Sequence, residues 1–428
     1  MLKKLLLIVM ITLSCAFCSA AAAAEQLRVA LAVGQSTVEI SCDDEFEVMS
    51  GGQQTVMPKG KYFLHTADGR LQLDEQHQFG GSIYVQALPG KALPQINKRS
   101  YKGYLRALLQ DNKLTVINYV GLEDYLASVL PAKTMVVWPD EAVKAQAVAA
   151  RSYALYMRSR NRNEYYDLLA TDAELQYTGT GPRIEKAGVT KLIQATAGQY
   201  LQDAYGTPVQ AVTTSSSGGR TEAAVNLWGR EVGYLQSVED YDSDSQEYTW
   251  EYRATPALLE GQLAQRGFVV GKLNSVRLSP LDEMGSDRTP TGRVKYVILS
   301  GNAGTAKIRG QELADILGLN SVLFDVETGT PPPETLKVPI EDRYGFEVGS
   351  KDIDIKIKED DKPVWNTLLR SYHMLGGGKD EKLIFHGKGK GSGLGLSAWG
   401  ARGMVNADEK ITYKDILAHY YPGTKLVR

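Results

Sequence analysis

Three segments of the chain carry the residue types that could perform chemistry. Ser215–Ser217 lead into Gly218 and Gly219, and a second glycine-rich run, GSGLGLSAWGA, spans residues 391–401. A serine becomes a nucleophile only when a base such as histidine lies beside it. The histidines lie in no triad-like context; they are His65, His77, His373, His386 and His419. The sequence therefore predicts that the serines line a polar cleft and do not attack a substrate.

The third segment is an Ala-rich run flanked by acidic residues. Asp140 and Glu141 follow Pro139, which is tolerated at the start of a helix, and the helix dipole favours negative charge in that first turn. Asp172 and Glu174 lie further along, in LLATDAELQYTG at residues 168–179. A carboxyl group with a raised pKa can protonate a leaving oxygen and then act as a base. Asp172, Glu174 and Glu141 are the candidates for that work, although the helix start already explains Glu141.

The N-terminus has the pattern of a secretory signal peptide at residues 1–24. Lys3 and Lys4 precede an apolar run and then small residues, with cleavage expected among Ala20–Ala24. The run is too short for a stable membrane span, and Cys15 and Cys18 do not follow the small-residue pair of a lipoprotein anchor. No later segment is apolar enough to cross a bilayer. We therefore expect a secreted, periplasmic or cell-wall-associated protein with no membrane span after signal cleavage.

Composition excludes several classes of protein. Without the signal segment a single cysteine, Cys42, remains, so no internal disulfide and no Cys/His zinc cluster is expected. Apart from the two signal lysines, 46 basic residues stand against 50 acidic residues. That balance does not indicate a nucleic-acid or anionic-membrane partner. We expect no metal and no cofactor.

The first part of the chain reads as β structure and then changes to helix. Residues 25–120 show short alternating runs such as Leu27–Val33 and Leu114–Val120, separated by regularly spaced turn signals. A short helix is expected over Glu123–Leu130, ended by Pro131. A core helix is expected over Ala142–Met157, because small residues at this density indicate close packing.

Later elements alternate between the two types. Helices are expected at 187–197, Pro256–Arg266, Arg309–Leu317 and Tyr413–Tyr420, and a hairpin at 199–202 with 209–214. Strands are expected at Ser275–Leu278 and Val294–Ser300. Residues 328–382 read as a charged insertion, with a strand at Ile353–Ile357 and a helix at Trp365–Leu375. The fold class is α+β: a small N-terminal β region (25–120) precedes an α/β core at 121–327. Residues 383–428, a glycine-rich loop and helix, complete that core.

The order of these motifs resembles the SpoIID/LytB family (stage II sporulation protein D and the amidase enhancer LytB) from about Leu27 to the C-terminus, apart from the insertion. The KAQAVAARSYA run is a specific signal, whereas SSGG or GSGLG alone is weak. The motifs that carry the resemblance are LEDYL at 122–126, Trp138-Pro139, KAQAVAARSYA at 144–154, SGGRT at 217–221, Trp228-Gly229, Tyr234-Leu235, Trp399-Gly400-Ala401 and YYPG at 420–423.

The resemblance implies a SpoIID-like mixed fold and binding of peptidoglycan glycan strands. Enzymes of the family are lytic transglycosylases, which cut between N-acetylmuramic acid and N-acetylglucosamine and leave a 1,6-anhydro end. Such a cut needs one carboxylate, because the 6-hydroxyl of the sugar attacks. LytB-like members are described as enhancers of a cell-wall amidase, which makes an amidase a further expected partner.

Three departures from the family pattern affect its polar residues. The family pattern is roughly VPxEMPxxWP, and here Lys133 stands at the glutamate position; a lysine with a pKa near 10.4 is a weak acid at pH 7. In the late loop Ser392 replaces a histidine and Ala398 replaces a glutamine. Some members bind zinc near LLATDAELQYTG, but Leu169, Ala173 and Glu174 cannot reproduce those ligands.

The resemblance also implies a set of glycan-binding residues. They are Trp138, Gln146, Arg151, Gln176, Tyr177, Ser217, Gly218, Gly219, Gly391, Ser392, Gly393, Gly395, Ser397 and Ala398. Alternatives remain open for several of them. Trp138 and Trp399 either stack on sugar rings or fill the core. Arg151 is either a ligand contact or half of a structural ion pair, and Lys133 is an inert surface residue, a carboxylate-binding residue or a catalytic residue.

Three hypotheses follow. The first is a glycan-binding pseudoenzyme, with no catalytic residue, that regulates wall remodelling in sporulation or by enhancing an amidase. The second is an active lytic transglycosylase with a relocated acid; Glu174 is the substitute, since its segment flanks the site in the family. The third is a scaffold whose β region and insertion bind a protein partner beside a vestigial cleft.

Overall fold

The computed structural model has an α+β fold, as predicted, divided into two compact units. The structure describes residues 26–133, 138–171, 175–180, 188–282, 285–329, 335–341, 347–354, 356–359, 362–365, 370–378 and 381–428. The predicted signal peptide lies outside these residues. Unit 1 contains Met1–Thr213 and Val405–Arg428, and unit 2 contains Thr214–Met404. The predicted core segment 121–327 is thus shared between the units. None of the described helices combines the length and apolarity needed to span a membrane.

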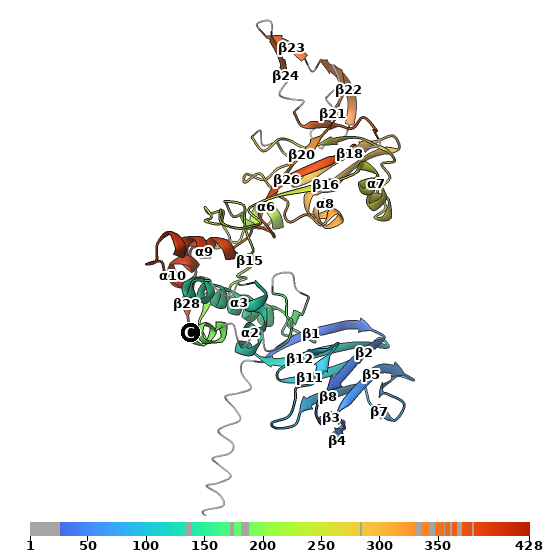
Figure 1. Ribbon diagram of the computed structural model, residues 1–428, viewed down its shortest axis with the longest axis vertical. Helices are drawn as coiled ribbons and strands as arrows, with labels where there is room; N and C mark the ends of the chain where they lie inside the picture. The colour runs from blue at the N-terminus through green and yellow to red at the C-terminus, as the bar shows by residue number, and fades with distance from the viewer. Residues whose placement is uncertain are drawn as a thin grey trace, which may run out of the picture. The chain divides into compact units, whose positions relative to one another are not determined.

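Unit 1 begins with two sheets that occupy most of residues 26–121 and are antiparallel except where β13 pairs with β1 in parallel (Figure 1). Buried and exposed side chains alternate along strands such as β2, which explains why these short runs form sheets with one apolar face. The first sheet has the order β13 (Leu168–Leu169), β1 (Gln26–Gln35), β12 (Lys113–Gly121), β11 (Tyr104–Gln110), β8 (Ser82–Ala87), β3 (Phe46–Ser50) and β4 (Gln53–Met57). The second has the order β10 (Arg99–Ser100), β9 (Gln95–Ile96), β2 (Thr37–Cys42), β5 (Gly60–Ala67), β6 (Arg70–Leu73) and β7 (His77–Phe79).

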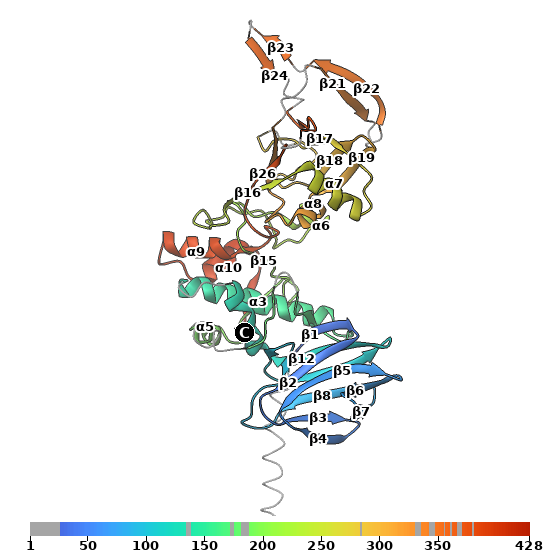
Figure 2. The same cartoon turned by 45° about the vertical axis from the view of Figure 1, so that its right-hand side comes forward.

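The helices of unit 1 surround α3 (Asp140–Arg160), the long helix of the Ala-rich run (Figure 2). Its side chains are buried from Ala142 to Ala154 except Lys144, because alanines let other elements approach from every side. Its neighbours are α2 (Leu122–Lys133), α5 (Val189–Ala195), α10 (Tyr413–Tyr420) and β14 (Tyr200–Gln202).

A buried ion pair joins α2 to α3. The Arg151 side chain is fully buried, and its Nε and Nη2 donate to the two carboxylate oxygens of Glu123 at 2.9 and 2.7 Å. Its Nη1 donates to the carbonyl of Gln199 at 2.9 Å. Arg151 therefore forms the structural pair that was one of its two predicted roles.

Two local predictions for unit 1 differ in part from the structure. The helix α2 does not end at Pro131 but continues to Lys133, because a proline removes one backbone hydrogen bond while the residues after it can still bond to the preceding turn. Of the hairpin predicted for 199–202 with 209–214, the part next to the turn is present: Gln202 bridges Pro208, and the Val209 amide donates to the Leu201 carbonyl at 3.0 Å. The far end differs, because β15 (Thr213–Thr214) pairs with β27 (Leu396–Ser397). Strand β14 also pairs with β28 (Lys425–Val427), a distant partner that local pattern does not specify.

Two of the sheets described in unit 2 and the helices α7 (Pro256–Gln265) and α8 (Gly310–Leu317) surround one apolar core. Leu259, Val276, Val297, Phe324 and Phe385 are fully or almost fully buried in it. The first sheet has the order β16 (Thr249–Ala254), β26 (Leu383–Lys388) and β20 (Phe324–Thr328). The second has the order β19 (Gly304–Arg309), β18 (Tyr296–Gly301), β17 (Leu273–Arg277) and β25 (Tyr372–Met374). The helices are α6 (Ala224–Trp228), α7 and α8, and α9 (Ala398–Ala407) spans the unit boundary.

The predicted insertion contains two hairpins, β21 (Thr335–Glu341) with β22 (Glu347–Asp354) and β23 (Lys356–Glu359) with β24 (Lys362–Trp365). The helix expected over Trp365–Leu375 is wrong at both described ends, since Lys362–Trp365 and Tyr372–Met374 are strands. The second of these, β25, pairs with β17 of the core sheet. That pairing outweighs a local helical pattern, because burial and ladder hydrogen bonds are worth more than intrinsic propensity.

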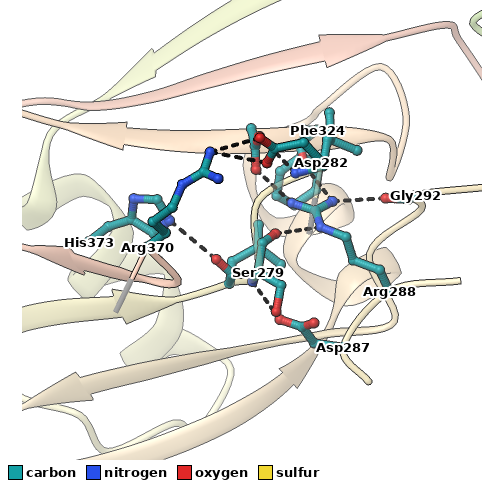
Figure 3. Close-up of polar contacts among 11 residues, drawn as sticks. Ser279, Asp282, Asp287, Arg288, Gly292, Phe324, Arg370 and His373 are labelled. Atoms are coloured by element: carbon teal, nitrogen blue, oxygen red, sulfur yellow. Dashed lines mark hydrogen bonds and ion pairs between the residues drawn. The ribbon is translucent and has the colours of Figure 1, made fainter. Parts of the chain in front are cut away.

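A polar network lies beside β25 (Figure 3). The buried guanidinium of Arg288 donates to the carbonyls of Ser279, Gly292 and Phe324 and pairs with Asp325 at 2.6 Å. His373 Nε2 lies 3.3 Å from the Leu278 carbonyl. Burial lowers the pKa of His373 below its ordinary value, although the bond to Leu278 and the charge of Asp325 oppose that shift.

Replacing Glu123 with glutamine is expected to destabilise unit 1 by about 3 kcal/mol, because Arg151 would keep a buried charge without its counter-ion. Urea unfolding followed by circular dichroism measures this loss. The matched control is Asp124→Asn in the same helix, which removes an exposed pair with Lys102 and should cost less than about 1 kcal/mol. Equal losses in the two variants would contradict the structural role of Arg151.

The stability of unit 2 is expected to fall as the pH drops below about 6.5, the ordinary histidine pKa. Because the folded pKa of His373 is lowered, the unfolded chain binds the extra proton first, and acid therefore favours unfolding. Urea midpoints measured between pH 7.5 and 5 should show a smaller acid loss in His373→Gln than in the native chain. The partly exposed His65, replaced in the same way, serves as the control. An unchanged pH profile in His373→Gln would refute this assignment.

Candidate functional site

Two chain segments far apart in sequence meet in unit 2 and form a polar surface, which we call the loop pair: residues 214–219 and 389–395. Ser216 and Lys390 exchange backbone hydrogen bonds at 3.1 and 2.8 Å, so the two segments form an antiparallel bridge. Thr214 Oγ1 donates to the Lys390 carbonyl at 2.9 Å and accepts from the Gly393 amide at 3.2 Å. The structure thus joins the serine run and the late glycine-rich loop that the sequence singled out separately.

Close backbone approach explains the glycines of the loop pair. A Cβ on Gly393 would lie 1.8 Å from Nη2 of Arg293, and a Cβ on Gly389 would lie 2.6 Å from the Ser216 carbonyl oxygen. Both residues also have positive φ angles, +78° and +73°. Glycine is the residue that meets both conditions without strain.

Two buried carboxylates hold the serine segment, and a third, Glu222, bonds to residues outside it. Asp242, fully buried, accepts from Ser216 Oγ at 2.5 Å and from the amides of Gly218 and Gly219 at 2.8 and 2.9 Å. Asp240 accepts from Ser217 Oγ at 2.5 Å. Glu222 accepts from the amide of Ala223, from Asn226 and from the hydroxyl of Thr291. The hydroxyls of Ser216 and Ser217 are thus committed to holding the loop.

Arg293 supplies positive charge at the centre of these carboxylates. Its side chain is almost completely buried, and Nη2 donates to the carbonyls of Ser217 at 2.8 Å and Arg220 at 3.4 Å. Burial lowers the pKa of the Arg293 guanidinium, and Glu222, Asp242 and Asp240 oppose that shift. Among the described residues its Nε and Nη1 have no hydrogen-bond partner. Arg293 therefore holds the backbone of the loop pair through its bonds to the Ser217 and Arg220 carbonyls.

The accessible part of the loop pair is small and polar. Lys390 and Gly391 are exposed, Ser392 is half-exposed, and the Ser392 hydroxyl accepts from the Leu394 amide at 3.2 Å. Lys390 Nζ donates to Glu247 at 2.8 Å, and the same carboxylate accepts from Ser215 at 3.1 Å. Backbone groups, hydroxyls and a charge pair of this kind can form hydrogen bonds with sugar hydroxyls.

Several predicted binding residues of unit 2 are interior. Gly393 and Gly395 are buried, Ser397 is fully buried and accepts from the Gly400 amide at 3.0 Å, and Ala398 is 5% exposed. Ser217 is 1% exposed, whereas Gly218 and Gly219 are partly exposed. The structure therefore gives the buried members a part in holding the loops, and their contact with glycan stays a prediction.

The predicted residues of unit 1 are also mostly buried. Trp138 is 8% exposed, at the start of α3, and Gln146 is 4% exposed and donates to the Ala142 carbonyl at 3.3 Å. Gln176 is exposed, but the neighbouring Tyr177 is buried and donates to Asn118 at 2.6 Å. Burial raises the pKa of the Tyr177 hydroxyl, so it stays protonated at neutral pH.

The positions that decide catalysis are described only in part. Lys133 is the last residue of α2, and its side chain lies outside the described residues. Asp172, Ala173 and Glu174 also lie outside them. Leu169 forms part of β13 and is 42% exposed. Within the described part of the chain no group of three or more His, Cys, Asp or Glu residues is placed to hold a metal ion.

Sequence reasoning missed Arg293 and the three carboxylates. The acidic run EDYDSDSQE at 239–247 was the available signal, because buried aspartates near a glycine-rich loop often accept from backbone amides. Arg293 gave no signal of its own: it follows a Thr-Gly turn like many surface arginines.

Comparison with known proteins gives consistent relatives. The family model described as SpoIID, stage II sporulation protein, matches residues 110–202. An uncharacterised protein of Brachyspira hyodysenteriae is 27% identical over 83% of this chain and 79% of its own length. The amidase enhancer of Bacillus subtilis is 26% identical over 91% of this chain, although the match spans 52% of that relative. Stage II sporulation protein D of Bacillus subtilis is 23% identical over 72% of this chain and 75% of its own length.

Replacing Gly393 with alanine is expected to destabilise unit 2 by at least about 2 kcal/mol, because the new Cβ would overlap the Arg293 guanidinium at a positive φ. Thermal or urea unfolding measures the loss. Gly233→Ala is the control, since a Cβ there meets no atom within 4 Å and φ is not in the left-handed region. Similar stability of the two variants would refute the close packing of the loop on Arg293.

Proposed function

Because the chain belongs to the SpoIID/LytB family, we propose that it acts at the bacterial cell wall and binds the glycan strands of peptidoglycan without cutting them efficiently. The observation that carries the proposal is the loop pair: its glycine-rich frame is built tightly on Arg293, while Ser392 and Ala398 occupy the two polar positions of the family motif.

The frame is suited to hold a neutral polar polymer. Most of its charged groups are buried and paired with hydroxyls or amides, so the exposed part presents mainly backbone groups, hydroxyls and the Lys390–Glu247 pair. Hydroxyl-rich sugars are recognised by such mixed donors and acceptors. A preformed frame also lowers the conformational entropy lost on binding.

Efficient cutting needs an acid that this chain does not place at the family position. A glycosidic oxygen leaves only when it is protonated, and a positioned carboxylic acid is the usual donor. The residue at that position is Lys133, and an ordinary lysine, with a reference pKa near 10.4, is a poor acid at pH 7. The proposal therefore makes the protein a glycan-binding pseudoenzyme.

Its biological role would then be regulatory. One relative bears the name amidase enhancer, and others bear the name stage II sporulation protein D. We infer that this chain, secreted by its N-terminal signal segment, brings or stimulates a separate wall amidase on glycan strands. The insertion at 328–382 and the β region are the segments that could contact that partner.

The test is incubation of peptide-stripped glycan strands with the mature protein, with 1,6-anhydro ends read by mass spectrometry and binding read by co-sedimentation. We expect binding without anhydro products. Lys133→Glu restores the family residue and is expected to bind equally; any anhydro products would then come from this variant alone.

Binding should also depend on the loop pair. Gly393→Ala is expected to reduce co-sedimentation more than Gly233→Ala does, with folding of both checked by circular dichroism. Clean anhydro ends from the native protein would overturn the pseudoenzyme assignment and direct attention to Glu174. Absence of binding by the native protein would overturn glycan recognition itself.

A further inference from the structure

Unit 1 contains a cavity of about 1060 Å³. Of the residues predicted to bind glycan, only Arg151 is among those that line it. The cavity lies beside the C-terminal half of α3, on the order of 27 Å along the helix axis from Asp140. β1, the 197–208 segment and the end of the described chain complete its wall. A volume at the upper limit of ordinary ligand pockets suits a peptide-sized ligand better than a single small ion.

Arginine dominates the polar lining of this cavity. Asp167 is the one carboxylate-bearing side chain among its lining residues. The five arginines are Arg28, Arg151, Arg158, Arg162 and Arg428. Like charges gathered around one concave space repel one another and attract anions, and the cavity walls strengthen that field.

Two of the arginines are already neutralised. Arg28 pairs with Asp167 at 2.6 Å and also donates to the carbonyls of Glu164 and Asn161. Arg151 pairs with Glu123, as described above. These pairs show that the guanidinium groups here bind carboxylates through two nitrogens, the geometry that arginine prefers.

Two others retain their binding capacity. Arg162 and Arg428 are exposed and make no hydrogen bond or ion pair with another described residue. Arg158, half-buried on the last turn of α3, lines the same cavity and adds positive charge to it. The apolar side chains of Leu155, Pro208 and Leu122 line the same space, which suits a peptide with aliphatic parts.

We propose that this arginine-lined cavity binds the carboxylates of an acidic peptide. The identity of the peptide rests on the proposed function: we infer that it is the stem peptide attached to wall glycan. Arg162 and Arg428 form the new charge-assisted hydrogen bonds, while the paired Arg28 and Arg151 fix the shape of the wall. The protein would thereby distinguish peptide-bearing strands from peptide-stripped strands through a surface separate from its loop pair.

The test is calorimetric titration of the whole protein with a soluble stem tetrapeptide released from peptidoglycan. Affinity is expected to fall at least about tenfold in the double variant Arg162→Gln/Arg428→Gln, and to weaken as salt is raised. The matched control is Arg160→Gln, an exposed arginine on the last turn of α3 that does not line the cavity. The same tetrapeptide with its carboxylates amidated should not bind.

The outcomes separate this inference from the proposed function. Equal tetrapeptide binding by the native protein, the double variant and Arg160→Gln would overturn the cavity as the site, as would no binding by the native protein. Poly(glycerol phosphate) binding through the same two arginines in preference to the peptide would overturn the carboxylate assignment. Peptide-stripped strands should bind the double variant as well as the native protein; failure of the native protein to bind them contradicts the proposed function alone.

Discussion

A buried positive charge in each unit sets the positions of the segments that matter for function. In unit 2, Arg293 lies under Gly393 and donates to the Ser217 carbonyl, with three carboxylates nearby. A buried charge costs far too much unless polar groups surround it, so the loops cannot move independently of that residue. In unit 1, Arg151 also donates to a backbone carbonyl, that of Gln199, and it pairs directly with the Glu123 carboxylate.

This constraint makes the frame of the loop pair independent of its exposed side chains. The loop pair is held by interior contacts among Thr214, Ser216, Asp242 and Arg293, none of which needs the polar side chains at positions 392 and 398. A change at the half-exposed Ser392 is therefore expected to leave these interior contacts intact.

The two units present different chemistry on their surfaces. The loop pair presents neutral donors and acceptors with one exposed charge pair, which suits sugar hydroxyls. The cavity beside α3 presents arginines, which suit acids. Peptidoglycan contains both kinds of group on one molecule, and a protein that reads both can respond to whether strands still carry peptides.

By itself the sequence determined the α+β class, the extent of the β region, the core helix α3 and the glycine-rich loops, because periodicity, alanine density and glycine runs are local properties. The resemblance to the SpoIID/LytB family predicted departures from the family pattern at Lys133, Ser392 and Ala398. The tertiary structure alone decided the pairing of Tyr372–Met374 with β17, the continuation of α2 past Pro131 and the pairing of β14 with β28. It also decided that Arg151 forms an ion pair with Glu123, that Arg293 lies against Gly393 and that five arginines line one cavity. Each of these depends on contacts between residues distant in sequence, whose burial and hydrogen bonds outweigh the local preferences that a sequence displays.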